Sequence, residues 1–273
     1  MKKILALGLA VLLIVSVLAV SVSAEEGEEN DHTYYVRIEG VSANLYNGMF
    51  TVNTEAEKVT AKDLFVAMDS QVEELTFTGL NDGYISSVNG ETAGTQTDKG
   101  WDGWMFRVNG EAPDVGIADF ALEDYDEVVL YYSDEFNTGM QFPQIDGSML
   151  TFGVLHFYSL DTEYDEQSNP VVKNNPVQDM TVIVDGVEYK TSEAGNITLN
   201  AAQRTTGSHT IQVSRKADNG LETVLRFAPD TEIFVEDNPH TGDSVAVYVV
   251  LGVLSLLTLA GTAVVARKKG MSL

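Results

Sequence analysis

An uncharged stretch of 22 residues near the C-terminus, 245–266, constrains this chain more than any other feature. A helix of about 20 apolar residues crosses the roughly 30 Å hydrocarbon core of a bilayer. Arg267, Lys268 and Lys269 follow the stretch directly, and a cationic flank is typical of the cytoplasmic side of a membrane span. The sequence therefore predicts a transmembrane helix over 245–266, a short basic tail inside the cell and the rest of the chain outside.

The N-terminus carries a second apolar segment of a different kind. Lys2 and Lys3 precede an apolar run over 4–20, and small residues follow up to Ala24. A positive start, an apolar middle and a small-residue end are the features of a secretory signal peptide. We expect residues 1–24 to be removed by cleavage after Ala24, and the alternative is a retained N-terminal anchor.

The residues just before the predicted span resemble a known signal. Asn238-Pro239-His240-Thr241-Gly242 has the order Asn-Pro-x-Thr-Gly, and an apolar span and a basic tail follow it. This three-part arrangement is similar to the cell-wall sorting signal of Gram-positive bacteria, in which a sortase cuts between Thr and Gly and joins the Thr carboxyl to peptidoglycan. The resemblance implies sortase recognition through Asn238, Pro239, Thr241 and Gly242. The alternative is a protein that keeps its single membrane span.

Composition excludes several classes of function. The chain has no cysteine, so it contains no disulfide, no thiol nucleophile and no cysteine-based metal site. Without the five basic and one acidic residues of the two ends, 25–241 holds 11 basic and 40 acidic residues, a net charge near −29. Nucleic-acid binding requires a cationic surface, so we expect no nucleic-acid partner. A strong negative charge keeps a protein soluble and separate from its copies.

The first half of the central region combines strand-like runs with one helical segment. Helical spacing is clearest over 60–68, where Thr60 suits the N-cap position and Asp63 the acidic third position. Asn-Gly pairs at 89–90 and 109–110 supply the positive φ angles that tight hairpin turns require. One short helix among several strands predicts an α+β layer, in which the helix covers one face of a curled sheet.

The ordered motifs of this region carry a second resemblance. They are Tyr84-Ile85-Ser86-Ser87-Val88-Asn89-Gly90, Gly100-Trp101-Asp102-Gly103-Trp104-Met105-Phe106-Arg107-Val108-Asn109-Gly110, Gly116-Ile117-Ala118-Asp119-Phe120 and Asp126-Glu127-Val128. Together they make 33–135 similar to the C-terminal domain of transcobalamin and to its bacterial relatives, a family of domains of largely unknown function with a β-grasp-like fold. Tyr125 departs from the family, which usually has Gly at this position.

This resemblance implies a surface for a small ligand. In transcobalamin the domain covers the corrin ring of cobalamin, so a corrinoid is the candidate ligand, and no other cofactor is required. The positions that match the motif are Trp104, Phe106, Val115, Gly116, Ile117 and Ala118. Apolar and aromatic walls with a few backbone donors suit a flat ligand. The alternative is that Trp104 and Phe106 are core residues of a strand and Gly116 is a turn glycine.

The second half of the central region shows short alternating runs between turn signals, which predict an immunoglobulin-like β-sandwich over 147–235. A hairpin about Asp185-Gly186 is the clearest of these signals. The order of motifs resembles carboxypeptidase-regulatory-like and collagen-adhesin B-type repeats, and these motifs are Pro176 to Tyr189, Glu193 to Leu199 and Gly207 to Ser214. Such repeats are surface stalk modules. Some relatives carry a Lys–Asn isopeptide bond, for which Lys173 and Lys190 are candidates by residue type alone.

Catalytic and metal-binding motifs are absent from the sequence. The four histidines show no metal-ligand spacing, and His156 and His209 lie in strand patterns that favour a structural role. No nucleophile elbow and no phosphate-binding glycine loop is present. We therefore expect neither a metal nor an enzymatic activity.

These features together predict a mainly β protein whose segments follow a fixed order: signal peptide 1–24, acidic spacer 25–32, transcobalamin-like domain 33–135, β-sandwich stalk 147–235 and sorting signal 238–273. We expect a protein of the cell wall and extracellular surface that the membrane holds transiently through its C-terminal helix before attachment to peptidoglycan. It would display a module that binds a small molecule. The alternative is an adhesin or structural spacer that recognises a host or matrix protein or a glycan and no small ligand.

Overall fold

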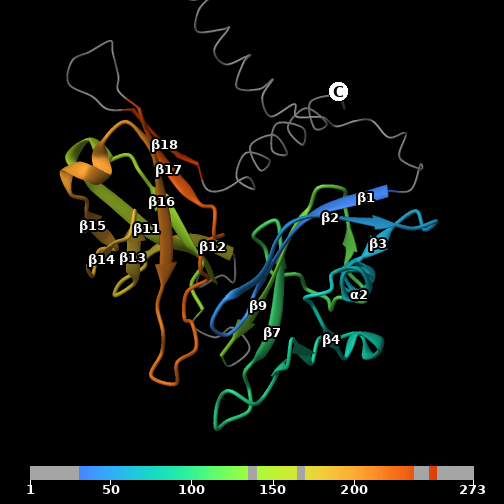
Figure 1. Cartoon of the computed structure of the whole chain (residues 1–273). Helices are drawn as coiled ribbons and strands as arrows, with labels where there is room; N and C mark the ends of the chain where they lie inside the picture. Colours follow the sequence, from blue (N-terminus) through green and yellow to red (C-terminus); the bar gives the residue numbers. More distant parts are fainter. Residues whose placement is uncertain (1–30, 135–139, 165–169, 237–245, 251–273) are drawn as a thin grey trace, which may run out of the picture.

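The computed structural model describes residues 31–134, 140–164, 170–236 and 246–250 (Figure 1). The predicted signal peptide with Ala24, and the predicted sortase motif, lie outside these residues. Within the described residues no helix is long and apolar enough to cross a membrane. Most regular structure in this part of the chain is strand, so the prediction of a mainly β fold is confirmed.

The first domain is built on a four-stranded mixed sheet in the order β2-β1-β9-β7. β1 (Asp31–Glu39) pairs antiparallel with β2 (Asn44–Asn53) and parallel with β9 (Glu127–Ser133). β7 (Gly103–Val108) then pairs antiparallel with β9. The first and last strands of the domain are therefore neighbours at the centre of the sheet.

A single helix, α2 (Ala61–Gln71), covers one face of this sheet (Figure 1). The Thr60 hydroxyl accepts a hydrogen bond from the Asp63 amide at 3.2 Å, and the Asp63 carboxylate accepts one from the Thr60 amide at 2.9 Å. This capping box confirms the predicted helix start. The buried residues of the helix join strand residues in one hydrophobic core, and these include Ala61, Leu64, Phe65, Met68, Tyr34, Val36 and Ile38.

Short elements complete the first domain. β3 (Val59–Thr60) pairs with β8 (Ala121–Leu122). A separate three-stranded sheet contains β4 (Phe77–Thr78), β5 (Ser87–Val88) and β6 (Glu91–Thr92). Asn89 and Gly90 have φ angles of 50° and 84°, and Asn109 and Gly110 have 52° and 78°. Both Asn-Gly turns thus adopt the predicted left-handed conformation.

The second domain packs two sheets around its own hydrophobic core. One sheet contains β10 (Pro143–Asp146), β11 (Val154–Tyr164), β12 (Pro170–Pro176) and β15 (Asn196–Thr198). The other has the order β14-β13-β16-β17-β18, formed by β13 (Thr181–Val184), β14 (Val187–Lys190), β16 (Gly207–Ser214), β17 (Glu232–Glu236) and β18 (Ala246–Val250). This two-layer arrangement is consistent with a β-sandwich, and β10 extends it N-terminal to residue 147.

β18 differs from the sequence prediction. Residues 246–250 belong to the apolar stretch for which we predicted a helix over 245–266, yet they pair antiparallel with β17. Val247, Val249 and Val250 are β-branched, a property that favours strands, and the edge of β17 offers backbone partners. Residues 251–266 lie outside the described part of the chain.

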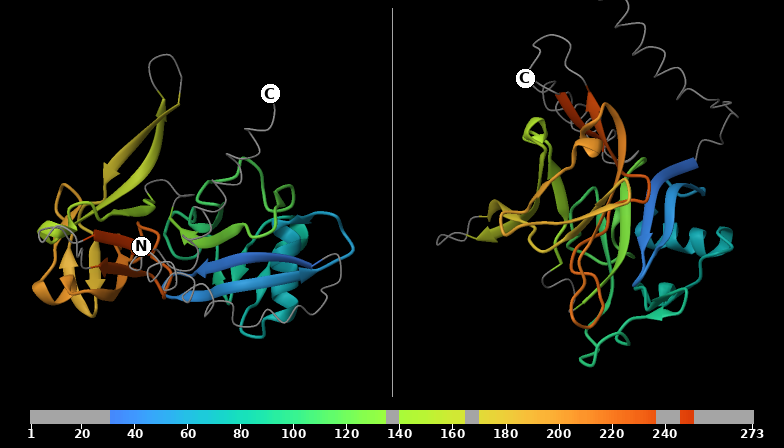
Figure 2. Two further views of the ribbon diagram at one scale, coloured as in Figure 1. Left: turned by 90° about the horizontal axis from the view of Figure 1, so that it is seen from above. Right: turned by 60° about the vertical axis from the view of Figure 1, so that its left-hand side comes forward.

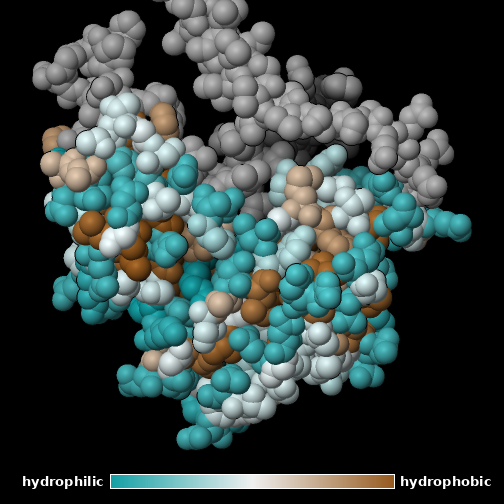
Figure 3. Space-filling view, in the orientation of Figure 1, coloured by the Kyte–Doolittle hydropathy of each residue, from teal (hydrophilic) through white to brown (hydrophobic). Residues whose placement is uncertain are grey.

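The hydrophobic core of the described residues lies entirely between Tyr34 and Val235. A fragment over 25–241 therefore contains every core residue whose burial is described, and it lacks the edge strand β18. On the face shown in Figure 3, hydrophobic residues form small patches that hydrophilic ones interrupt.

Candidate functional site

The two predicted aromatic ligand residues, Trp104 and Phe106, lie on β7 with their rings partly buried against the first core. The Trp104 indole donates a hydrogen bond to the Glu91 carbonyl at 2.8 Å, and its ring meets Tyr132 edge-on with centroids 5.3 Å apart. The Phe106 ring meets Phe120 in the same way at 6.1 Å. Both rings are therefore engaged within the domain, as the core alternative expects.

The other predicted residues lie together in one loop beside Gly83. Ile117 is buried in the core, and its carbonyl accepts a hydrogen bond from the Lys62 amide at 2.9 Å. Val115, Gly116 and Ala118 are exposed on the loop surface. Their binding of a ligand stays a prediction, because exposure alone does not show it.

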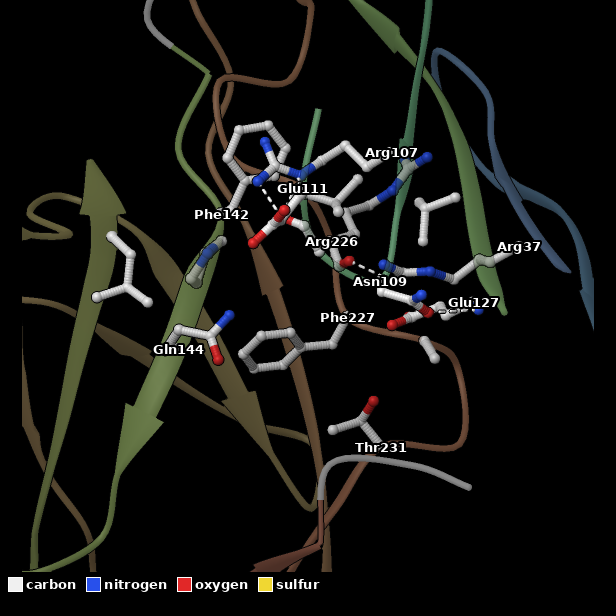
Figure 4. Close-up of a pocket in the computed structure, with 16 residues that line it drawn as sticks. Arg37, Arg107, Asn109, Glu111, Glu127, Phe142, Gln144, Arg226, Phe227 and Thr231 are labelled. Atoms are coloured by element: carbon white, nitrogen blue, oxygen red, sulfur yellow. Dashed lines mark hydrogen bonds between the residues drawn. The ribbon is translucent and has the colours of Figure 1, made fainter. Parts of the chain in front are cut away.

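A cleft of about 420 Å³ lies elsewhere, between the two domains (Figure 4). Side chains of β1, β7 and β9 form its floor, on the sheet face opposite α2. β10 and the segment 225–231 of the second domain form the facing wall. Clefts of roughly 300–1,000 Å³ hold drug-sized ligands, so the size of this one suits a small molecule.

Strand alternation explains how the floor of the cleft arises. Tyr34, Val36 and Ile38 of β1 face the helix side, so Arg37 and Glu39 point to the opposite side. By the same alternation β9 directs Glu127, Val129 and Tyr131 to that side, and β7 directs Met105 and Arg107 to it. The residues of this second face are therefore covered by the second domain rather than by the helix.

Arg37 is the most buried charged group of the cleft, with 7% of its surface exposed. Its Nη1 donates to the Arg226 carbonyl at 2.7 Å and lies 3.7 Å from Glu39 Oε1. Its Nε is buried and has no hydrogen-bond partner in the described part of the chain. Burial lowers the pKa of Arg37, and the Glu39 and Glu127 carboxylates oppose this shift.

An ion pair across the domain boundary stands beside Arg37. Glu39 is 3% exposed, and its Oε2 accepts a hydrogen bond from Arg226 Nε at 3.0 Å. Arg226 Nη2 also donates to the Gly40 carbonyl at 2.7 Å, and its Nη1 lies 3.9 Å from Glu222 Oε1. These contacts fix the segment around Arg226 against β1.

A second arginine, Arg107, joins the domains through an aromatic ring. Its guanidinium carbon lies 3.8 Å from the centroid of the Phe142 ring, a cation–π contact. Its Nε donates to the Gly110 carbonyl at 2.9 Å, so the Asn-Gly turn orients the side chain. Tyr131 packs edge-on against Phe142, and burial raises the pKa of Tyr131 to about 12 while the positive charge of Arg107 opposes this shift.

Glu127, the first residue of β9, lines the floor of the cleft. Its backbone amide donates to Asn109 Oδ1 at 2.9 Å, and Asn109 Nδ2 donates to Asp126 Oδ1 at 2.7 Å. Burial raises the pKa of Glu127, and the charge of Arg37 opposes this effect. The cleft thus combines aromatic walls with charged groups, a lining of the kind found in sites for small polar ligands.

The remaining candidate groups have structural contacts. His209 Nδ1 lies 2.6 Å from Asp185 Oδ2, and its Nε2 lies 2.7 Å from the Thr205 carbonyl oxygen. Lys190, a candidate for a Lys–Asn isopeptide bond, forms a surface ion pair with Asp179, with Nζ and Oδ1 3.2 Å apart. Its partner in this pair is an aspartate, whereas an isopeptide bond of that kind requires an asparagine. Within the described ranges, no group of three or more His, Cys, Asp or Glu side chains could hold a metal ion.

Sequence reasoning did not find the cleft. One feature of the sequence does point to the cleft. Arg37 and Glu39 alternate with apolar residues in the predicted first strand, which places two charged side chains on the same face of the sheet. The residues opposite them, such as Phe142 and Arg226, lie more than 100 positions away in the sequence and carry no motif. Only the fold brings these two sets together.

Comparison with known proteins covers part of the chain. The model of a family described as a domain of unknown function (DUF4430) matches residues 64–134, which run from α2 to the end of β9. The matched region includes Arg107 and Glu127 of the cleft. No curated protein matches the chain. The first domain therefore carries a DUF4430-like region over 64–134.

Proposed function

We propose that this protein is a non-enzymatic surface protein of a Gram-positive cell wall that binds a small ligand in the cleft between its two domains. The observation that carries this proposal is the cleft itself, with a volume of about 420 Å³, walls that include Phe142 and Phe227, and the buried Arg37. A concave, partly apolar site with a few convergent polar groups, at a domain boundary, is the usual setting for small-ligand binding.

The DUF4430 match supports the resemblance to transcobalamin, because that family is related to transcobalamin-like domains. A corrinoid therefore stays among the candidate ligands, with the loop 115–118 as its predicted contact. The cleft suits a ligand of a few rings or one edge of a larger macrocycle, since its volume falls in the lower part of the range for drug-sized molecules. Binding at the loop 115–118 and binding in the cleft would be abolished by different substitutions.

Calorimetric titration of the fragment 25–241 with cobalamin, haem and small aromatic acids tests this proposal. Gln144 lines the cleft from β10, and Gln144→Trp should fill the cleft and abolish binding. Gln71→Trp, at the exposed end of α2, is the matched control and should leave binding unchanged. Flat titrations with every ligand would reject ligand binding. Loss of binding in Val115→Asp but not in Gln144→Trp would move the site to the loop.

The proposed anchoring rests on the order of sorting motif, apolar span and basic tail. A muralytic enzyme should release the protein from whole cells, and Thr241→Ala should prevent its covalent attachment to the wall. Complete extraction by detergent alone would show that the protein is held only by its membrane span. This test is independent of ligand binding.

A second candidate function is binding of a protein partner, and the β11–β12 hairpin favours it. The hairpin projects from the sandwich in Figure 2, and Leu160, Val171 and Val172 are exposed on it. Exposed apolar residues on a projecting element suit contact with another protein. Val172→Glu should reduce attachment of cells to a matrix if the protein is an adhesin, and it should leave ligand titrations unchanged.

A further inference from the structure

The strongest unexplained feature of the cleft is an unsatisfied buried donor. Arg37 is more than nine-tenths buried, and its Nε has no hydrogen-bond partner among the described residues. Figure 4 shows its guanidinium pointing toward the middle of the cleft. A buried donor without an acceptor costs free energy, so the site favours a ligand that brings an acceptor.

The neighbouring side chains narrow the choice of acceptor. Arg226 is committed to Glu39 and to the Gly40 carbonyl, so it has fewer donors to offer. Arg107 lines the same cleft over Phe142, and its Nε and Nη2 donate to the Gly110 carbonyl, so its Nη1 is the donor left for a ligand. Two guanidinium groups at one cleft suit an oxyanion, because the donor fork of arginine matches two oxygens of a carboxylate or a phosphate.

Two carboxylates decide between these two anions. Glu111 and Glu127 also line the cleft, and both would repel a bound anion. A phosphate monoester carries up to two negative charges near neutral pH and a carboxylate carries one, so a carboxylate meets the smaller repulsion. The aromatic rings of Phe142 and Phe227 in turn suit a flat apolar body next to the charged group.

We infer that the ligand of this cleft is a planar aromatic carboxylic acid, whose carboxylate binds Arg37 and Arg107 and whose ring system lies against Phe142 and Phe227. This inference rests on the proposed function, since it names the chemical class of ligand for the same site. It requires no metal and no covalent step.

A pair of probes that differ only in charge tests the inference. 2-Naphthoate and 2-naphthamide share one ring system, and only the first is an anion. Calorimetric titration of 25–241 should show that naphthoate binds at least about tenfold more tightly, because hydrogen bonds from arginine to a charged acceptor are stronger than those to a neutral one. Gln144→Trp should abolish the binding of both probes.

Variants of the two arginines locate the carboxylate. Arg107→Gln and Arg37→Lys should each weaken naphthoate binding about tenfold and weaken naphthamide binding by a smaller factor, because the amide is a neutral acceptor. Arg37→Lys keeps the positive charge, so its effect reports the loss of the guanidinium geometry. Lys58→Gln removes one exposed positive charge away from the cleft and should change neither affinity. Circular dichroism checks the fold, and Arg107→Gln decides the question if Arg37→Lys is unfolded.

The outcomes separate this inference from the proposed function. Equal affinities for the two probes, both abolished by Gln144→Trp, would overturn the carboxylate inference and leave the cleft as the binding site. Tight naphthoate binding that survives in folded Arg107→Gln would also overturn it. If neither probe binds, the inference falls, and the cleft stays a site only if another ligand of the titration panel binds in a way that Gln144→Trp abolishes.

Discussion

The two faces of the β2-β1-β9-β7 sheet are both buried, but the second one buries charged side chains beside its hydrophobic cluster of Val129, Tyr131 and Met140. On one face Tyr34, Val36 and Ile38 pack beneath α2 in a hydrophobic core. On the other face Arg37 and Glu39, their neighbours on the same strand, are buried beneath the second domain. The comparison shows that burial alone does not distinguish a structural face from a candidate binding face.

The free-energy balance differs between the two faces. The apolar face gains from removal of hydrocarbon from water, at about 25 cal/mol per Å². The polar face must compensate for desolvated charges with ion pairs and hydrogen bonds, and a pair that loses one partner leaves an expensive buried charge. In the described part of the chain both faces hold a buried polar atom without a partner, but only on the second face is it part of a charged group, Arg37, that lines a cleft.

The largest expected effect comes from the apolar face. Phe65→Ala should lower the free energy of unfolding of the first domain by about 3–5 kcal/mol, because it removes a fully buried ring from beneath the sheet. Guanidinium unfolding followed by tryptophan fluorescence measures this domain, since Trp101 and Trp104 both belong to it. Val66→Ala, at the exposed neighbouring position, should cost less than 1 kcal/mol by the same principle of burial. Equal losses would mean that the helix does not pack as described.

A substitution on the polar face should lower the unfolding free energy somewhat less, and it should also alter how the two domains unfold together. Arg226→Met removes the closer of the two arginines at the buried Glu39, which keeps the Asn44 amide donor at 2.9 Å and Arg37 at 3.7 Å, and we expect a loss of about 3 kcal/mol. Because Arg226 joins the two domains, calorimetry should also show their unfolding transitions moving apart. Arg204→Met removes an exposed arginine of the second domain and is the matched control. An unchanged melting profile for Arg226→Met would contradict the cross-domain ion pair.

Asp102 offers a third test, because it is a buried charge whose hydrogen bonds are complete. Its carboxylate accepts hydrogen bonds from the Gln96 amide at 2.9 Å, the Thr97 amide at 3.1 Å, the Thr97 hydroxyl at 2.6 Å and the Tyr132 hydroxyl. Burial by itself would raise the pKa of Asp102, but these bonds outweigh it and lower the pKa to about 2. Asp102→Asn should cost about 2 kcal/mol at neutral pH, since the amide group cannot accept all of these bonds.

The sign of its pH dependence follows from the lowered pKa. The folded pKa of about 2 lies below the ordinary value of 3.8, so this stabilisation is present above about pH 4 and is lost as the pH falls toward 2. The difference in unfolding free energy between wild type and Asp102→Asn should therefore shrink between pH 5 and pH 2.5. Asp98→Asn, at an exposed position of the same loop, is the control. A constant difference over this pH range would refute the assignment.

The apolar face could be predicted from the sequence, and the polar face could not. Local signals were sufficient for the helix with Thr60 and Asp63, and for the Asn-Gly turns. The contact of Arg37 with the Arg226 carbonyl spans 189 positions in the sequence, and no periodicity encodes a partner at that distance. Trp104 and Phe106 show the opposite difficulty. A family motif predicted them as ligand-binding residues, and their rings pack against the hydrophobic core of the first domain.

The smallest expected change in unfolding free energy concerns the turn that leads into β9. This strand contributes side chains to both faces of the sheet. Tyr125 has a φ angle of 67°, in the left-handed region that costs a side chain roughly 1 kcal/mol and that glycine adopts freely. Its amide donates to the Thr33 carbonyl at 2.6 Å, so the turn is held in this conformation by β1. Tyr125→Gly should relieve the strain at a smaller cost in chain entropy, with a net stabilisation of about 0.5 kcal/mol.

A matched tyrosine separates relief of strain from loss of a side chain. Tyr84 is exposed to 56% and Tyr125 to 59%, but Tyr84 has no positive φ angle. Tyr84→Gly should therefore lower the unfolding free energy by about 0.5–1 kcal/mol through chain entropy alone. Urea unfolding of both variants by tryptophan fluorescence compares them directly. If Tyr125→Gly destabilises the domain as much as Tyr84→Gly does, the left-handed turn carries no strain, and the entry to β9 is held by contacts of the Tyr125 ring instead.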